Sequence, residues 1–207
     1  MPRSRFQQRT SWIVIAVAVV AAALVLGACG HGDERAIRSV LVAGLTSQDP
    51  RTVCEGSLAP ALLARIYGDI GSCHRVEGER GEQISQALSV NVSGVHVTHG
   101  HATAVVTIHG GNHDGARGAL TLARGGRAWR VTDLSAGLLR SEFEVSLRRA
   151  QGVEPGAKAC IVAGMRAIDD ETFKRLAFDA GTGAHNRLSD VARECRARIA
   201  GAENLVR

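Results

Sequence analysis

The sequence predicts an α+β fold in which helices pack on an antiparallel sheet, with a small α-helical segment at the C-terminus. Residues 90–98 and 101–110 alternate apolar and polar side chains on either side of His99-Gly100, and residues 116–124 and 127–134 do so around Gly125-Gly126. Two-residue turns with glycine join antiparallel neighbours, so these runs predict two hairpins. The flanking segments space apolar residues three or four apart, as helices do, and this combination indicates the α+β class.

Residues 1–28 are expected to be an export signal that is removed. Arg3, Arg5 and Arg9 precede an apolar run, residues 12–26, as in signal peptides. The next residues, Leu26-Gly27-Ala28-Cys29, resemble the lipobox of bacterial lipoproteins, in which the cysteine is diacylated before cleavage. The resemblance implies lipidation of Cys29, a tether of residues 29–32 and a place outside the cytoplasm, anchored to the outer face of the cell membrane. The alternative is an uncleaved membrane helix, which needs about 20 apolar residues.

The charge balance argues against nucleic-acid binding. The chain has 25 basic and 20 acidic residues. Three of the basic residues lie in the expected signal, which has no acid, so 22 basic residues and a net charge of +2 remain. Because the remaining arginines are scattered among acids and are not interleaved with aromatic residues, we expect no nucleic-acid partner.

Four cysteines remain after Cys29: Cys54, Cys73, Cys160 and Cys195. An even number in an exported chain predicts two disulfides, and four cysteines allow three connectivities. Pairing between sequence neighbours is the simplest, joining Cys54 to Cys73 and Cys160 to Cys195. A metal site is the weaker alternative, because no CxxC or CxxH pair is present.

Three helical stretches are expected before the sheet. They cover residues 33–45, 52–55 and 57–67. Asp33 and Ser57 have side chains typical of N-caps, and Pro60 would lie in a first turn, where its missing N–H is tolerated. Cys73 is expected in a loop, and residues 77–86 as a connector or an irregular strand.

The turns predict the strand register. In the first hairpin Val95 is expected opposite Ala104, and in the second Leu122 opposite Trp129, with Leu120 opposite Val131. Side chains of one face share the core. In the first hairpin these are Val95, Val97, Ala102, Ala104, Val106 and Ile108. Trp129 is expected to be a core residue, with stacking on a ligand as the alternative.

Helices are also expected after the sheet. Ser135 is a candidate cap for the first, and the glycine-rich residues 152–156 form the boundary between a domain of residues 33–151 and a segment of residues 152–207. Residues 157–168 and a stretch starting at Asp169 are expected to be helical. After a loop of residues 181–186, a final helix is expected to present Leu188, Val191, Cys195 and Ile199.

The pattern of residues 33–134 resembles the nuclear transport factor 2-like superfamily, in particular lipoproteins of actinobacteria. The resemblance is carried by Leu45-Thr46-Ser47-Gln48-Asp49, a helical stretch with Cys54, a loop with Cys73, the hairpin with Ala102-x-Ala104-Val105-Val106, and Ala128-Trp129-Arg130-Val131. It implies a cystatin-like cone, in which a curved sheet wraps a long helix. It also implies a pocket, whose lining would include Ala104, Val106, Leu122 and Trp129. The family includes isomerases, cyclases and non-catalytic members, so it does not decide the function.

Catalysis is not expected. An isomerase or cyclase needs a carboxylate base and a donor for an oxyanion, often a phenol. The only tyrosine is Tyr67 and the only acid in the strands is Asp133, and neither is placed to point into the cone. We therefore expect no enzyme activity and no cofactor.

Three histidines near the first turn are a candidate metal site. His96, His99 and His101 could bind zinc or copper at the surface. A solvated polar strand face explains them more simply.

The expected function is non-covalent binding outside the cytoplasm. One hypothesis is an interaction module that docks another protein of the cell envelope. The alternative is a carrier of a small apolar ligand in the cone. The first predicts a filled cone and an exposed apolar patch, and the second a cavity of at least about 300 Å³.

Overall fold

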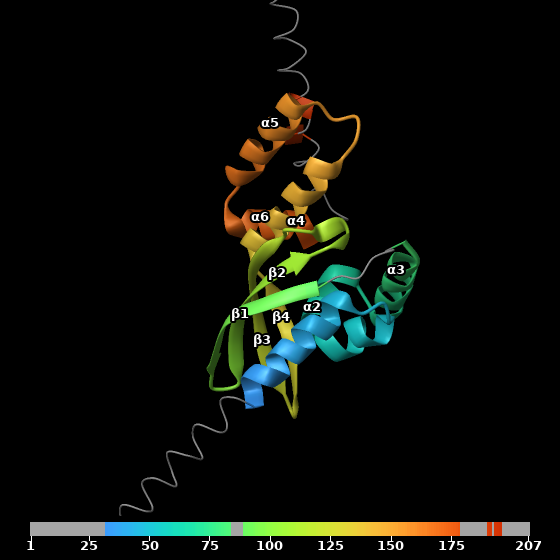
Figure 1. Ribbon diagram of the computed structural model, residues 1–207, viewed down its shortest axis with the longest axis vertical. Coiled ribbons are helices and arrows are strands. Elements are labelled where there is room, and N and C mark those ends of the chain that lie inside the picture. The colour runs from blue at the N-terminus through green and yellow to red at the C-terminus, as the bar shows by residue number, and fades with distance from the viewer. Residues whose placement is uncertain (1–31, 84–88, 179–189, 192, 196–207) are drawn as a thin grey trace, which may run out of the picture.

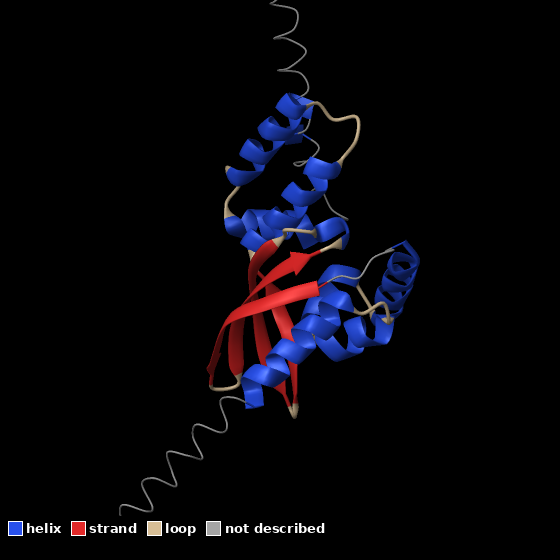
Figure 2. Cartoon of the chain, in the orientation of Figure 1, coloured by secondary structure: helices blue, strands red, loops and turns tan. Residues whose placement is uncertain are grey.

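The computed structural model describes residues 32–83, 89–178, 190–191 and 193–195 (Figure 1). In these residues, the chain forms four antiparallel strands in the order β1-β2-β3-β4, with helices on both sides along the sequence (Figure 2). The elements are an N-terminal helix (residues 32–46), η1 (Thr52–Ser57), α2 (Pro60–Tyr67), α3 (Ile70–Gln83), β1 (Ser89–Thr98), β2 (His101–His109), η2 (Gly111–His113), β3 (Arg117–Gly125), β4 (Ala128–Leu134), α4 (Ala136–Arg149), α5 (Pro155–Arg166) and α6 (Asp170–Phe178). The predicted α+β class is confirmed.

The first hairpin has the predicted turn but also a β-bulge. His99 and Gly100 both have positive φ, and Thr98 faces His101. Further along, Gly94 and Val95 together lie opposite Ala104, with Gly94 at φ 57°. The expected register is therefore wrong beyond the bulge, because one extra residue shifts the strand. The buried side chain of β1 is Val92, whereas Val97 is 37% exposed.

The second hairpin differs from the expected register by two residues near its turn. Gly126 has positive φ and begins the turn, while Gly125 belongs to β3 and pairs with Ala128. Leu122 consequently faces Val131, and a shift of two residues keeps the side chains on their predicted faces. An irregularity between Thr121 and Leu122 adds a third residue to the shift, so Leu120 faces Leu134 and not Val131 as expected.

The N-terminal helix crosses the inner face of the sheet (Figure 1). Ile37 and Leu41 of this helix are fully buried against a cluster from all four strands. The buried members from the strands are Val92, Ala102, Ala104, Val106, Leu120, Leu122, Trp129 and Val131. Asp33 lies inside the helix and does not cap its start. Instead its carboxylate accepts the indole N–H of Trp129 (3.2 Å) and pairs with Arg124 (3.0 Å).

The segment between this helix and the sheet is more helical than expected. Cys73 lies in α3 and not in a loop, and α3 also occupies most of the expected connector. Its glycines weaken the apolar periodicity that would have revealed it. Asp69 precedes α3 and accepts the N–H of Ser72 (2.7 Å), a hydrogen bond that lowers the pKa of Asp69. Ser57 is also not a cap, because it is buried and α2 begins after Ala59, with Pro60 at its first position.

The C-terminal helices agree with the prediction where they are described. Ser135 caps α4 by accepting the N–H of Leu138 (3.1 Å), and Phe173 and Leu176 of α6 are buried. Both predicted disulfides, Cys54–Cys73 and Cys160–Cys195, are present. The expected loop of residues 181–186 and the side chains of Leu188 and Ile199 lie outside the described residues.

Close contact between β3 and α4 depends on a glycine. A Cβ at Gly118 would lie 2.4 Å from the Cα and N atoms of Leu138. Ser135 supports the same contact, because its hydroxyl also accepts the N–H of Ala119 (3.1 Å). Since backbone atoms cannot move aside as a flexible side chain does, this position requires glycine.

The Gly118→Ala variant should therefore be destabilised by about 1–3 kcal/mol or more, as expected for overpacking. The urea midpoint of unfolding measures the change. Gly125→Ala is the matched control, because a Cβ there meets nothing within 4 Å and φ is not positive; its midpoint should stay close to that of the parent. Equal midpoints for the two variants would contradict the tight packing of β3 on α4.

Candidate docking groove

The side chains expected to line a cone pocket lie in the main core. Ala104, Val106, Leu122 and Trp129 are all at most 3% exposed and pack in one cluster with residues of the N-terminal helix. None of them lines the groove described next.

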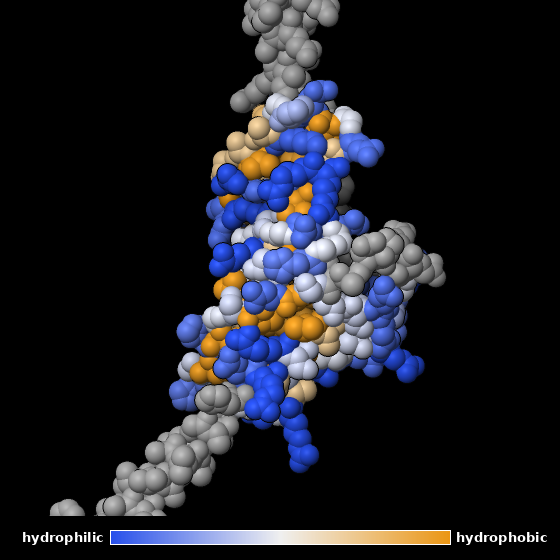
Figure 3. All heavy atoms as spheres, in the orientation of Figure 1, coloured by the Kyte–Doolittle hydropathy of each residue, from blue (hydrophilic) through white to orange (hydrophobic). Residues whose placement is uncertain are grey.

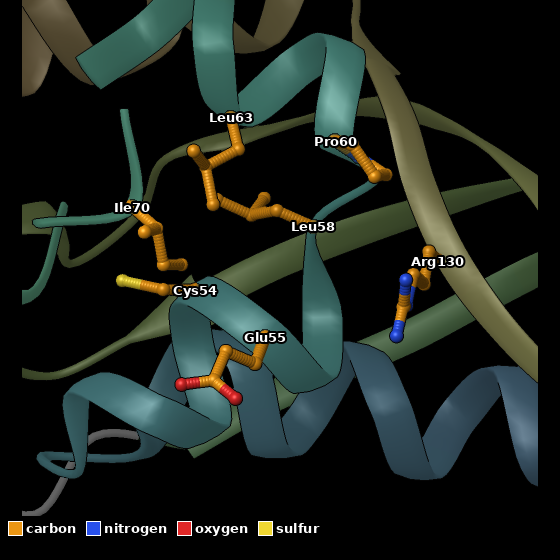
Figure 4. Close-up of a pocket in the computed structure, with 7 residues that line it drawn as sticks. All are labelled: Cys54, Glu55, Leu58, Pro60, Leu63, Ile70 and Arg130. Carbon is orange, nitrogen blue, oxygen red and sulfur yellow. The ribbon is translucent and has the colours of Figure 1, made fainter. Parts of the chain in front are cut away.

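An open, mostly apolar groove lies beside β4, where the chain passes from η1 to α2 and α3 (Figure 4). Its volume is about 330 Å³. The lining residues are Cys54, Glu55, Leu58, Pro60, Leu63, Ile70 and Arg130. Ile70, at the start of α3, is 45% exposed, so an apolar side chain forms part of the rim.

Backbone pairing with β4 positions the middle of the groove. Leu58 forms a parallel bridge with Val131, and the N–H of Ala59 donates to the carbonyl of Val131 (2.8 Å). These bonds place Leu58 and the proline that follows Ala59 beside Arg130 of β4. The segment between η1 and α2 therefore pairs with β4 at only one residue. The side chain of Arg130, next to this pair, lines the groove.

A disulfide positions the opposite wall. Cys54 of η1 is bonded to Cys73 of α3, and both are buried. Leu63 of α2 packs in the same small cluster. The bond closes a loop of about 20 residues, which stabilises such a fold by roughly 3 kcal/mol, and it holds the first turn of α3, with Ile70, against η1.

Two opposite charges border the groove. The Nε atom of Arg130 is buried and has no hydrogen-bond partner among the described residues. Glu55 lies across from it in the close-up (Figure 4). Its Oε1 atom is 3.1 Å from Nε2 of His74, a pair that is ionic when the imidazole is protonated. The two atoms are not aligned for a hydrogen bond, so the contact is electrostatic.

The unpartnered Nε–H donor of Arg130 is the chemically unusual feature. Buried donors are nearly always hydrogen-bonded, and an unsatisfied one costs about 1–3 kcal/mol. A carboxylate that enters the groove would accept from Arg130, while an apolar side chain beside it would contact Leu58 and Ile70. The groove can therefore recognise an apolar group next to an acid.

The three histidines of the candidate metal site lie on the exposed surface of the first hairpin. His96 faces Thr103, His99 is in the turn, and His101 faces Thr98. Within the part of the chain that the structure describes, no three His, Cys, Asp or Glu side chains are grouped so that they could hold a metal ion.

Tyr67 and Asp133, the residues weighed for catalysis, both have structural partners. The Tyr67 hydroxyl donates to Glu77, which is buried, and Asp133 accepts from Lys174 of α6. Neither residue lines the groove. The described helices include none with the length and apolarity of a membrane span.

No protein-family model, curated protein or solved structure matches the chain. The site must therefore be interpreted from its own geometry.

Sequence reasoning did not identify Arg130 or Ile70 as site residues. An arginine in the middle of a strand indicates a polar environment, but the groove around it joins residues from η1, α2 and α3, and the sequence pattern did not reveal α3.

An unsatisfied buried donor contributes little to stability, so Arg130→Met should unfold at the same urea concentration as the parent or a slightly higher one. Arg124→Met is the matched control. It removes the partner of Asp33 and should lower the midpoint. A clear loss of stability in Arg130→Met would show that the guanidinium has a structural role and would contradict its assignment to a binding site.

Proposed function

We propose that this protein is a non-catalytic binding module of the bacterial cell envelope, anchored outside the cytoplasm through lipid on Cys29. In this proposal it docks a second envelope protein in the groove beside β4. The long helix on the inner face of an antiparallel sheet supports the further proposal of a nuclear transport factor 2-like cone.

The observation that supports the docking proposal is that Arg130 lies beside an apolar rim. A half-buried arginine whose Nε donor has no partner among the described residues and a half-exposed isoleucine line the same open groove. Charge complementarity favours a partner segment that carries Asp or Glu next to an apolar side chain. Docking surfaces combine apolar anchors with arginine in this way.

The alternative, a carrier of a small apolar molecule inside the cone, has less support. The side chains that would enclose such a molecule are in contact with Ile37 and Leu41 in the core cluster. The groove outside the cone is open, whereas carrier sites bury most of the ligand surface.

Site-specific photocrosslinking tests the docking proposal in cells of the source organism. A photoreactive residue at Ile70 should give an adduct with one envelope protein. The same residue at Val97, which is exposed on β1 at the other edge of the sheet, should not. In the Ile70 chain, Arg130→Glu should reduce the adduct about tenfold or more, because it opposes the partner's carboxylate.

An adduct that survives Arg130→Glu would place the partner elsewhere on α3. A small-molecule adduct in place of a protein would support the carrier alternative. Equal adducts at both positions would indicate non-specific contact and contradict a docking site in the groove.

The anchor has a separate test. The Cys29→Ser variant should lose the mass of the acyl chains, because the lipid attaches to the thiol, and should keep residues 1–28, since acylation precedes cleavage. The intact mass of the purified protein measures both changes. Cys73→Ser is not a useful control, since it opens a disulfide; Ser47→Ala changes a hydroxyl outside the signal and should carry the same acyl mass as the parent. A Cys29→Ser protein that keeps its acyl mass would contradict lipidation at this position.

A further inference from the structure

Three segments that are distant in sequence meet at one end of the molecule. They are the first turn of the N-terminal helix and the turns of the two hairpins, and α5 lies at the opposite end (Figure 1). The carbonyl of Gly100 accepts the N–H of Arg124 (2.8 Å), and Asp33 binds both Arg124 and Trp129. We call residues 32–35, 96–101 and 124–129 the hairpin end.

The hairpin end carries an excess of positive charge. Its two acids are already paired, Asp33 with Arg124 (3.0 Å) and Glu34 with Arg38 (2.8 Å). Arg35 and Arg127 are exposed, and neither forms an ion pair with any residue that the structure describes. Hydrophilic side chains project from this end in the space-filling view (Figure 3).

The charged groups of the hairpin end are Asp33, Glu34, Arg35, Arg124 and Arg127. Both acids are paired with arginine, so no unpaired acid of this end opposes an anionic surface.

The position of the anchor brings this end to the membrane. In the sequence Cys29 precedes Gly32 by three residues, and three residues of extended chain span at most about 11 Å. The Debye length at physiological salt is about 8 Å. The start of the N-terminal helix is thus held at a distance at which surface charges interact.

We propose that the hairpin end is a surface for anionic phospholipid headgroups, which Arg35 and Arg127 contact. This inference rests on the proposed anchor only for the direction in which the domain faces the bilayer. The groove and the C-terminal helices then remain accessible from the side and from above. Each arginine near an anionic surface contributes about 1 kcal/mol, so the two together should change affinity by tenfold or more.

Vesicle sedimentation measures the interaction without the anchor. The fragment of residues 30–207 keeps every residue that the structure describes and carries no lipid. It should bind vesicles of phosphatidylcholine mixed with phosphatidylglycerol and not vesicles of phosphatidylcholine alone. Arg35→Gln with Arg127→Gln should weaken binding about tenfold or more. Arg75→Gln with Arg148→Gln is the matched control, because both residues are exposed cations outside the hairpin end, and its binding should change little.

Hydrogen exchange identifies the surface directly. On anionic vesicles the amides of residues 97–101 and 125–128 should exchange more slowly, and those of α5 should not change. Equal binding to neutral vesicles, equal loss in both double-arginine variants, or protection of α5 in place of the hairpin turns would overturn the proposal. None of these results depends on lipidation, so an unlipidated Cys29 and a failed headgroup surface are distinguishable.

Discussion

Close packing of the N-terminal helix on the inner face of the sheet is the contact on which the rest of the structure depends. It is possible because β2 presents the small side chains of Ala102 and Ala104 to the helix, leaving room for Ile37 and Leu41. The end of the helix is equally crowded, since a Cβ at Gly44 would lie 2.6 Å from the Ser57 hydroxyl. The inner face is thus filled, and the segment between η1 and α2 bonds to the β4 edge, where the groove lies.

The sequence predicted those features that arise from local chemistry. Glycine at a two-residue turn located both hairpins, Ser135 located the start of α4, and cysteine spacing gave both disulfides. Near its turn the side-chain faces of the second hairpin were predicted correctly although the register was wrong by two residues, because strand alternation has a period of two. The hydroxyl of Ser57, by contrast, donates to the carbonyl of Thr52 at the start of η1 and does not accept an N–H of α2, which cap propensity alone does not predict.

What the sequence did not reveal lies mainly in α3 and in the groove. α3 is polar and contains several glycines, so its stability comes from the bond to η1 and the Asp69 cap and not from an apolar stripe. The bulge at Gly94 could have been suspected, since glycine inside a strand often marks one. The groove joins residues from η1, α2, α3 and β4, and its existence depends on tertiary packing that no single segment encodes.

The C-terminal helices contact the sheet. Lys174 of α6 pairs with Asp133 at the end of β4, and Phe178 belongs to the main core cluster, where Arg65 of α2 stacks on its ring at 4.7 Å. Arg140 of α4 binds Asp170 and lies over the ring of Phe173. These contacts join the helical segment to the C-terminal end of β4 and to the main core.

The bulge in β1 also affects how copies of the protein behave beside one another. β1 pairs only with β2 within the described residues, which leaves a ten-residue edge with free backbone groups. Gly94 bends this edge, and the guanidinium of Arg38 donates to the carbonyl of Val92. An irregular, partly occupied edge is a poor template for strand addition. A chain crowded with its own copies on a surface is thereby protected from edge-to-edge polymerisation into a continuous sheet.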